Sequence, residues 1–172
     1  MEEPCILDIK IGKRLYDDDA CDAKRERMIR KAKLSTSASL GFCISGYRMV
    51  DFKQSLKMVV KMKSEVRGLH EAEVLQTLKR FFQAAPEPLL TLILECLQRI
   101  SDTFRKITGR LYSCSVLITY DRFHPLERWN CRVIDFVHCH LRAPIPPGEA
   151  EYDRNFIEGI DSLIMQLTKH IS

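Results

Sequence analysis

The sequence predicts an α+β fold in which helices pack on antiparallel strands. Apolar side chains alternate with polar ones over residues 4–12, the period of a half-buried strand, and recur at helical spacing over 154–170. Hydrophobic residues make up 45% and charged residues 29% of the 172 positions, which is a globular composition in a chain long enough to bury a core. We therefore expect residues 1–172 to form a single domain.

Five segments are predicted in the first part of the chain. Residues 4–12 form a strand, and acidic residues at the start of 17–33 favour the initiation of a helix there. The polar run 35–39 predicts a loop, and 40–50 predicts a second strand that two glycines interrupt. Residues 51–66 include β-branched side chains and are expected to continue this strand pair.

Five further segments follow in the second part. Two prolines separate helical segments at 69–84 and 88–106. Two apolar segments, 111–121 and 131–140, are joined by about ten residues and predict a hairpin of strands. After a proline-rich loop, the chain ends in the helix over 154–170.

Composition excludes several classes of protein. No apolar run is long enough to span a bilayer, and the amino terminus lacks a signal-peptide pattern, so we expect no membrane insertion. Seven cysteines without a CxxC pair argue against a disulfide framework and indicate a reducing compartment, the cytoplasm or the nucleus. The net charge of +4 is modest and no aromatic residues interleave the bases, which argues against nucleic-acid binding.

The basic residues of the first predicted helix form a row. Lys24, Arg27 and Lys31 follow one another at i, i+3 and i+7, along the margin of an apolar stripe that includes Met28. One interpretation is the wall of an anion-binding cleft, and the other is an ordinary solvated basic face.

Asp8 and Lys10 project from the same face of the first predicted strand, about 7 Å apart. A lysine acts as a compact positive charge that suits a transferring phosphoryl group, while the carboxylate orients a hydroxyl or a sugar. The alternative is a surface ion pair that contributes little to stability.

Asp135 lies within the apolar run 133–138, where a carboxylate is costly to bury unless it is paired or bound to a metal. Such an aspartate at the end of a strand is typical of magnesium-holding positions in kinases. His138 and His140, with His124 and Cys131 nearby, are an alternative zinc cluster, although their spacing matches no zinc motif.

Six segments then match, in order, the motifs of one known family. Their residues are PCILDIKIG (4–12), STSASLGFCISGYRM (35–49), RGL (67–69), SCSVLITYD (113–121), IDFVH (134–138) and DRNFIEGIDSL (153–163). The first corresponds to the pattern PxxxDxKxG. Together they resemble the inositol polyphosphate kinase family along the whole chain.

The resemblance implies a kinase-like fold that transfers the γ-phosphate of ATP to a hydroxyl of a soluble inositol phosphate with Mg²⁺. It implies that Asp8 contacts the ribose or the accepting hydroxyl and that Lys10 contacts phosphates. Asp135 matches the aspartate that holds magnesium, and His138 matches a histidine near the accepting hydroxyl.

The same resemblance implies that Ser113 and Ser115 lie near the phosphates and that Arg27 and Lys31 bind substrate. Lys24 joins this group from the helical spacing and not from the family. We expect the protein to be a monomer whose partners are ATP and the inositol phosphate.

Several positions depart from the family pattern. Cys43 stands in place of an arginine, Cys114 in place of a serine, and the residues before Arg67 lack the usual aromatic and glycine. The chain begins three residues before PxxxDxKxG, so the resemblance implies a carboxy-terminal lobe without the amino-terminal ATP lobe. Multikinase-like activity is the leading hypothesis. The alternatives are a hexakisphosphate kinase making a pyrophosphate and a non-catalytic module that binds inositol phosphates.

Overall fold

A five-stranded antiparallel sheet forms the centre of the protein. The computed structural model describes residues 1–51, 56–141 and 152–171. The sheet has the order β3-β2-β1-β5-β6, and a separate two-stranded sheet pairs β4 with β7. The strands are β1 (Pro4–Ile11), β2 (Phe42–Asp51), β3 (Lys57–Lys61), β4 (Gly109–Leu111), β5 (Ser115–Asp121), β6 (Trp129–Ile134) and β7 (Cys139–Leu141).

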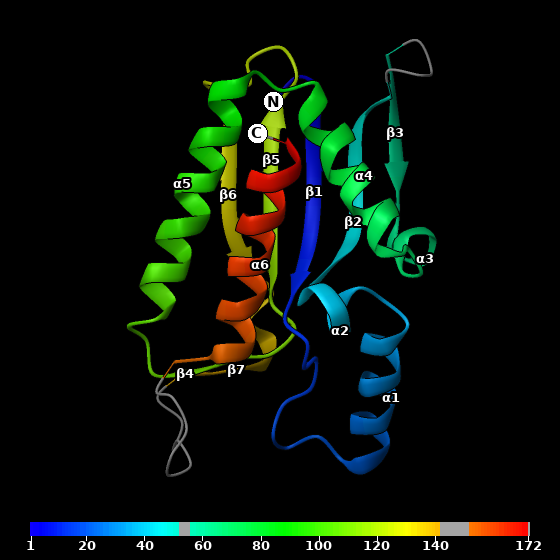
Figure 1. Ribbon diagram of the computed structural model, residues 1–172, viewed down its shortest axis with the longest axis vertical. Helices are drawn as coiled ribbons and strands as arrows, with labels where there is room; N and C mark the ends of the chain where they lie inside the picture. The colour runs from blue at the N-terminus through cyan, green and yellow to red at the C-terminus, as the bar shows by residue number, and fades with distance from the viewer. Residues whose placement is uncertain (52–55, 142–151, 172) are drawn as a thin grey trace.

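Three long helices cover one face of the large sheet (Figure 1). These are α4 (Glu71–Gln83), α5 (Glu87–Phe104) and α6 (Arg154–Ile171), and their apolar stripes join the sheet in one hydrophobic core. The short elements are α2 (Ser37–Leu40), α3 (Lys63–Val66) and the 3₁₀ turn η2 (Phe136–His138). Helix α1 (Asp22–Lys33) lies beyond the end of β1, outside this helical layer (Figure 1). None of the described helices is long and apolar enough to cross a membrane.

Strand β1 is the central strand of the large sheet, and apolar and polar side chains alternate along it. Its odd positions are completely buried beneath the helices, namely Cys5, Leu7, Ile9 and Ile11. Its backbone pairs with β2 on one side and with β5 on the other, both antiparallel. The predicted strand and the α+β class are therefore confirmed.

Three glycines allow α6 to approach the end of β1 closely. A Cβ atom on Gly159 would lie 2.5 Å from the Gly41 carbonyl oxygen and 3.0 Å from the Gly12 nitrogen, closer than side chains tolerate. Gly12 and Gly41 have φ of +103° and +76°, and the Gly12 N–H donates to the Gly41 carbonyl at 2.7 Å. Glycine adopts these angles without steric cost, so the packing requires it at all three positions.

The structure differs from the prediction at three places in the first part of the chain. The first helix begins at Asp22 and not at residue 17, because the preceding acids are held by tertiary contacts described below. The predicted loop 35–39 instead contains helix α2. The predicted continuation over 51–66 includes β3 and then turns into α3, while part of it lies outside the described residues.

The predicted hairpin forms as β5 pairs with β6, but both of its predicted strands are interrupted. Ser113 and Asp135 have φ of +60° and +66°, the left-handed region that ends a regular strand. The segment 111–121 therefore divides into β4 and β5, and 131–140 divides into β6, η2 and β7. Such strained backbone is common at functional sites.

Candidate active site

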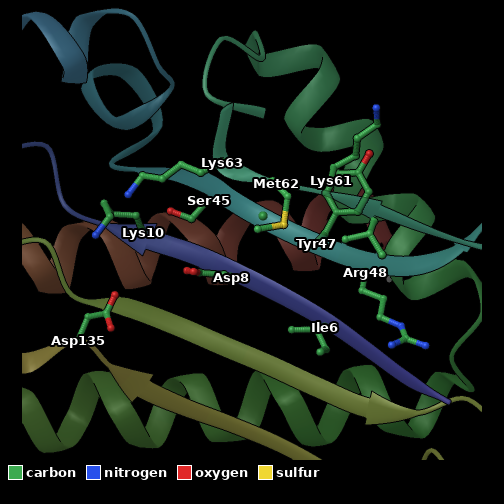
Figure 2. Close-up of a pocket in the computed structure, with 12 residues that line it drawn as sticks. Ile6, Asp8, Lys10, Ser45, Tyr47, Arg48, Lys61, Met62, Lys63 and Asp135 are labelled. Carbon is green, nitrogen blue, oxygen red and sulfur yellow. The ribbon is translucent and has the colours of Figure 1, made fainter. Parts of the chain in front are cut away.

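A cavity of about 470 Å³ opens on the face of the large sheet opposite α4, α5 and α6, which we call the open face. Figure 2 shows Asp8, Lys10 and Asp135 at one end of this cavity and Arg48 toward the other. Between them the lining is partly apolar, with Ile6, Val60 and Met62. The structure therefore brings together three of the residues that the sequence predicts as a site.

Lys10 points its ammonium toward the end of the cavity next to β5. Its Nζ donates to the Ser113 carbonyl oxygen at 2.6 Å, so the surface ion pair with Asp8 does not describe its contact. Burial lowers the pKa of Lys10, and the nearby Lys63 ammonium lowers it further. The charged form of Lys10 is therefore disfavoured in the protein alone, and a bound anion would stabilise it.

Asp8 is a carboxylate with an unused acceptor. Its Oδ1 is buried and has no hydrogen-bond partner among the described residues, and the same holds for Oγ of the neighbouring Ser115. Burial raises the pKa of Asp8, although the Ser115 hydroxyl and Lys10 act in the opposite direction. Unpaired buried polar atoms that face a cavity are typical of sites where a ligand completes the contacts.

The left-handed backbone at Asp135 ends β6 and places its carboxylate in the same cavity, facing the end of β1 (Figure 2). The turn packs on two cysteines. The Cys114 thiol donates to the Asp135 carbonyl at 3.5 Å, and the sulfurs of Cys114 and Cys139 lie 3.2 Å apart. The position of Asp135 is therefore set by the core behind it.

Three further cations gather beside Lys10 at this end of the cavity. Lys10, Lys31, Lys63 and Arg67 line one small adjoining hollow. Burial lowers the pKa of Lys31, and the positive charges of Lys63, Arg67 and Lys10 lower it further. Mutual repulsion of this kind is relieved by an anion, so the arrangement can accommodate a polyanion.

Lys63 and Arg67 were not among the predicted site residues. Their signal was present in the basic run that leads into 67-RGL-69, but only the tertiary structure places them against Lys10. Lys63 lies beyond the end of β3 and Arg67 follows α3, so both come from a segment far from β1 in sequence.

The predicted basic row of α1 divides into two parts. Arg27 and Lys31 line a hollow of about 460 Å³ together with Arg30 and Arg67, next to the cluster just described. Lys24 is directed elsewhere, because its Nζ lies 3.3 Å from the Asp17 carboxylate.

The remaining predicted residues occupy the margin of the site. His138 has its Nδ1 3.0 Å from Asp17 and is not among the residues lining the cavity. The Ser113 hydroxyl donates to the Leu15 carbonyl at 2.9 Å, so this serine reaches the site through its carbonyl and not its hydroxyl. Ser115 is completely buried and is not among the residues lining the cavity, but its hydroxyl lies beside Asp8 and acts to lower the pKa of that carboxyl.

Within residues 1–51, 56–141 and 152–171, no group of three or more histidine, cysteine or acidic side chains is arranged to hold a metal alone. His124 lies near Glu2 and Glu127, and the His140 ring faces Tyr112 at 6.1 Å. The alternative zinc cluster therefore does not assemble. Asp8 and Asp135 instead offer the carboxylate oxygens that Mg²⁺ prefers, with room for phosphate oxygens beside them.

Comparison with known proteins agrees with this geometry. A model of the family described as inositol polyphosphate kinase matches residues 1–168. The chain therefore belongs to the inositol polyphosphate kinase family.

Two relatives represent two branches of that family. Inositol hexakisphosphate kinase 3 of Mus musculus is 37% identical over 184 residues, which cover 95% of this chain and 46% of the relative. Inositol polyphosphate multikinase of Schizosaccharomyces pombe is 27% identical over 174 residues, covering 95% and 62%. The chain thus spans about half to three-fifths of the length of these relatives.

A solved structure confirms the kinase-like fold. Inositol phosphate multikinase Ipk2 from S. cerevisiae, in complex with ADP and Mn²⁺, superposes with a TM-score of 0.78 at 26% identity. The match covers 99% of this chain and 79% of that one.

Proposed function

We propose that this protein transfers the γ-phosphate of ATP to a hydroxyl of a soluble inositol phosphate. The observation that carries the proposal is the shared cavity of Asp8, Lys10 and Asp135, with Lys31, Lys63 and Arg67 directly beside it. Family membership and the similarity to a multikinase structure containing ADP and Mn²⁺ support it.

Phosphoryl transfer depends mainly on positioning and on charge stabilisation, and these residues supply both. Lys10 is fixed by the Ser113 carbonyl, so its charge can neutralise a phosphoryl group without first losing rotational freedom. The desolvated cations around Lys31 favour a compact substrate that carries several phosphates.

Asp135 and the unpaired oxygen of Asp8 would hold Mg²⁺. A bound divalent cation neutralises charge on the transferred group. Between these carboxylates and the cations lies the space in which we place the ATP phosphates. The Ser115 hydroxyl is completely buried beside Asp8 and supports the ionised form of that carboxylate.

Arg27 and Lys31 are proposed to bind phosphates of the inositol substrate, since they line the adjoining basic hollow. We also propose that the protein acts in the cytoplasm or the nucleus. All seven of its cysteines are free, which suits a reducing compartment.

A second candidate activity is the formation of a pyrophosphate on a fully phosphorylated inositol. The 37% identity to a hexakisphosphate kinase favours it, whereas the solved multikinase structure favours transfer to a hydroxyl.

The test is a panel of inositol phosphates incubated with γ-labelled ATP, with products separated by chromatography. We expect label in an inositol phosphate, and the number of phosphates in the product distinguishes the two activities. Asp135→Asn should abolish labelling while calorimetric binding of the inositol phosphate stays within about twofold, because the cationic hollow is unchanged. Asp102→Asn, an exposed residue on α5, is the matched control. Binding of inositol phosphates without any ATP binding or labelling would instead indicate a non-catalytic module.

A further inference from the structure

Three consecutive aspartates before α1 have different environments. Asp17 is 8% exposed, whereas Asp18 and Asp19 are exposed at the surface. Asp18 binds Arg14 and accepts a hydrogen bond from the Tyr112 hydroxyl, so it has a structural partner on each side. Asp17 has two other partners, Lys24 in α1 and His138 in η2, and neither of them belongs to the sheet.

The Asp17 carboxylate joins a helix to the turn that follows Asp135. Its Oδ2 lies 3.0 Å from Nδ1 of His138 and 3.3 Å from Nζ of Lys24. Burial alone would raise the pKa of Asp17, but the Lys24 ammonium and His138 more than offset this and hold it below its usual value. The carboxylate is therefore ionised at neutral pH.

An ionised carboxylate can only accept hydrogen bonds. At 3.0 Å it selects the form of the imidazole that carries a proton on Nδ1, which leaves the lone pair on Nε2. Lys24 can only donate, so it keeps the carboxylate charged without competing for the role of acceptor.

Both ends of this contact are held in place by packing. The Tyr112 N–H donates to the His138 carbonyl at 3.1 Å, which fixes the backbone of η2. On the other side, the Asn155 side chain accepts from the Lys13 and Arg14 N–H groups at 2.7 and 2.8 Å and anchors the segment that leads to Asp17. A side chain supported in this way can hold a neighbouring group in a reactive orientation.

We propose that Asp17 is a positioning residue for His138, and that it fixes the imidazole so that Nε2 accepts the proton of the hydroxyl being phosphorylated. The hydroxyl oxygen forms a bond to the γ-phosphorus as its proton moves to Nε2. The bond from that phosphorus to the β–γ bridging oxygen breaks, and its electron pair leaves with ADP. This inference rests on the proposed function and adds to it a base, His138 at the margin of the site, and the residue that orients this base.

The first test needs neither substrate nor turnover. Long-range ¹H–¹⁵N spectra of the ¹⁵N-labelled full chain, at a pH where imidazoles are neutral, report which nitrogen carries the proton, and His138→Gln assigns the signal. We expect Nδ1–H in the wild-type protein. A proton on Nε2 in the wild type overturns the proposal, whether or not any variant folds.

Asp17→Ala gives a sharper expectation. It removes the acceptor at 3.0 Å from Nδ1 of His138, so nothing selects the form with a proton on Nδ1. The form with the proton on Nε2 should then become populated, whereas Asp19→Ala, the matched control on the surface, should leave the spectrum unchanged. An unchanged tautomer in folded Asp17→Ala contradicts the proposal.

The second test is kinetic. Asp17→Ala should lower kcat by about a hundredfold with KM within about twofold, since the loss falls on proton transfer. The double variant Asp17→Ala, His138→Gln should be no slower than His138→Gln alone. Additive losses overturn the positioning role. A wild-type protein with the expected tautomer but no kinase activity instead overturns the proposed function, so the two failures are distinguishable.

Discussion

The two faces of β1 are formed by alternate residues of a single strand, yet one face is apolar and buried while the other is charged and lines a cavity. On the covered face Leu7 and Ile9 are completely buried against the helices. On the open face Asp8 and Lys10 keep charge in a partly buried cavity. The covered face therefore stabilises the fold. The open face carries charged groups whose interactions are incomplete until a ligand binds.

Folding disfavours the charged forms on the open face. Burial raises the pKa of Asp8 and lowers the pKa of Lys10 and of Lys31. An acid whose folded pKa is raised contributes most when it is protonated, and its contribution is lost as pH rises through the unfolded and then the folded pKa. At neutral pH the open face thus costs stability, as binding sites commonly do.

The largest expected effect comes from Asp8→Asn, which keeps the shape of the side chain and removes its charge. Turnover should fall by about a thousandfold, because a group that contacts the reacting phosphates is lost. The free energy of unfolding at pH 7 should rise, and the gain over wild type should shrink as pH falls through the raised folded pKa of Asp8 toward the unfolded value of about 4. Urea unfolding at several pH values measures this.

Asp121→Asn is the matched control for the sign of that effect. Burial acts to raise the pKa of Asp121. The Phe123 and Glu2 N–H groups donate to its carboxylate, outweigh this effect and hold the pKa below its usual value. Its contribution is present above the unfolded pKa and is lost in acid, so this variant should be less stable at pH 7. Equal signs for the two variants would refute the contrast between these positions.

On the covered face, Ile9→Ala should lower the free energy of unfolding by about 2–5 kcal/mol, because it leaves a cavity in the core. Urea titration measures the loss. Turnover per folded molecule at low temperature should change far less than in Asp8→Asn. A thousandfold loss of turnover here would mean that the two faces are not separable.

Arg27→Ala with Lys31→Ala should weaken the binding of an inositol phosphate by roughly a hundredfold, since two charge-assisted contacts are lost. Calorimetry at low and high salt should show a larger effect at low salt, where screening is weaker. Lys33→Ala with Lys79→Ala removes the same charge from exposed positions and should bind nearly as wild type. If the two double variants bind equally, the row on α1 is only a solvated face.

The smallest expected effect on turnover comes from comparing two completely buried serines, Ser115 and Ser101. Ser115→Ala on the open face should lower turnover about tenfold, because the hydroxyl that favours the ionised form of Asp8 is lost. Ser101→Ala in α5 removes a hydroxyl that donates to Asp161 at 2.8 Å. It should cost about 1 kcal/mol of stability and leave turnover unchanged. Steady-state kinetics and urea unfolding of both variants check the pair, and a slower Ser101→Ala would contradict the assignment.

Much of the fold and part of the site could be predicted because they depend on local pattern. The alternation of β1 requires one buried face, and it places Asp8 and Lys10 together on the other. The helical spacing near the carboxyl terminus likewise predicted α6, with Ile157, Ile160 and Leu167 buried. The motif residues also located Asp135 at the end of a strand.

Other features depend on contacts between distant segments, which no local pattern contains. The strand breaks at Ser113 and Asp135 arise where Lys10 binds one backbone and Cys114 supports the other, across 103 and 21 positions of sequence. Helical spacing placed Lys24 in a row of bases, but Asp17, held outside the helix, pairs with it.

The amino-acid pattern alone predicted the long helices, the strands of the large sheet, the charged face of β1 and the family to which the chain belongs. It did not predict which charges meet, because Lys63 and Arg67 reach Lys10 from a segment beyond β3. The difference lies in the range of the interactions. Periodic burial is set by neighbouring residues along a strand or helix, whereas the electrostatics of a cavity are set by whichever side chains the fold brings to it.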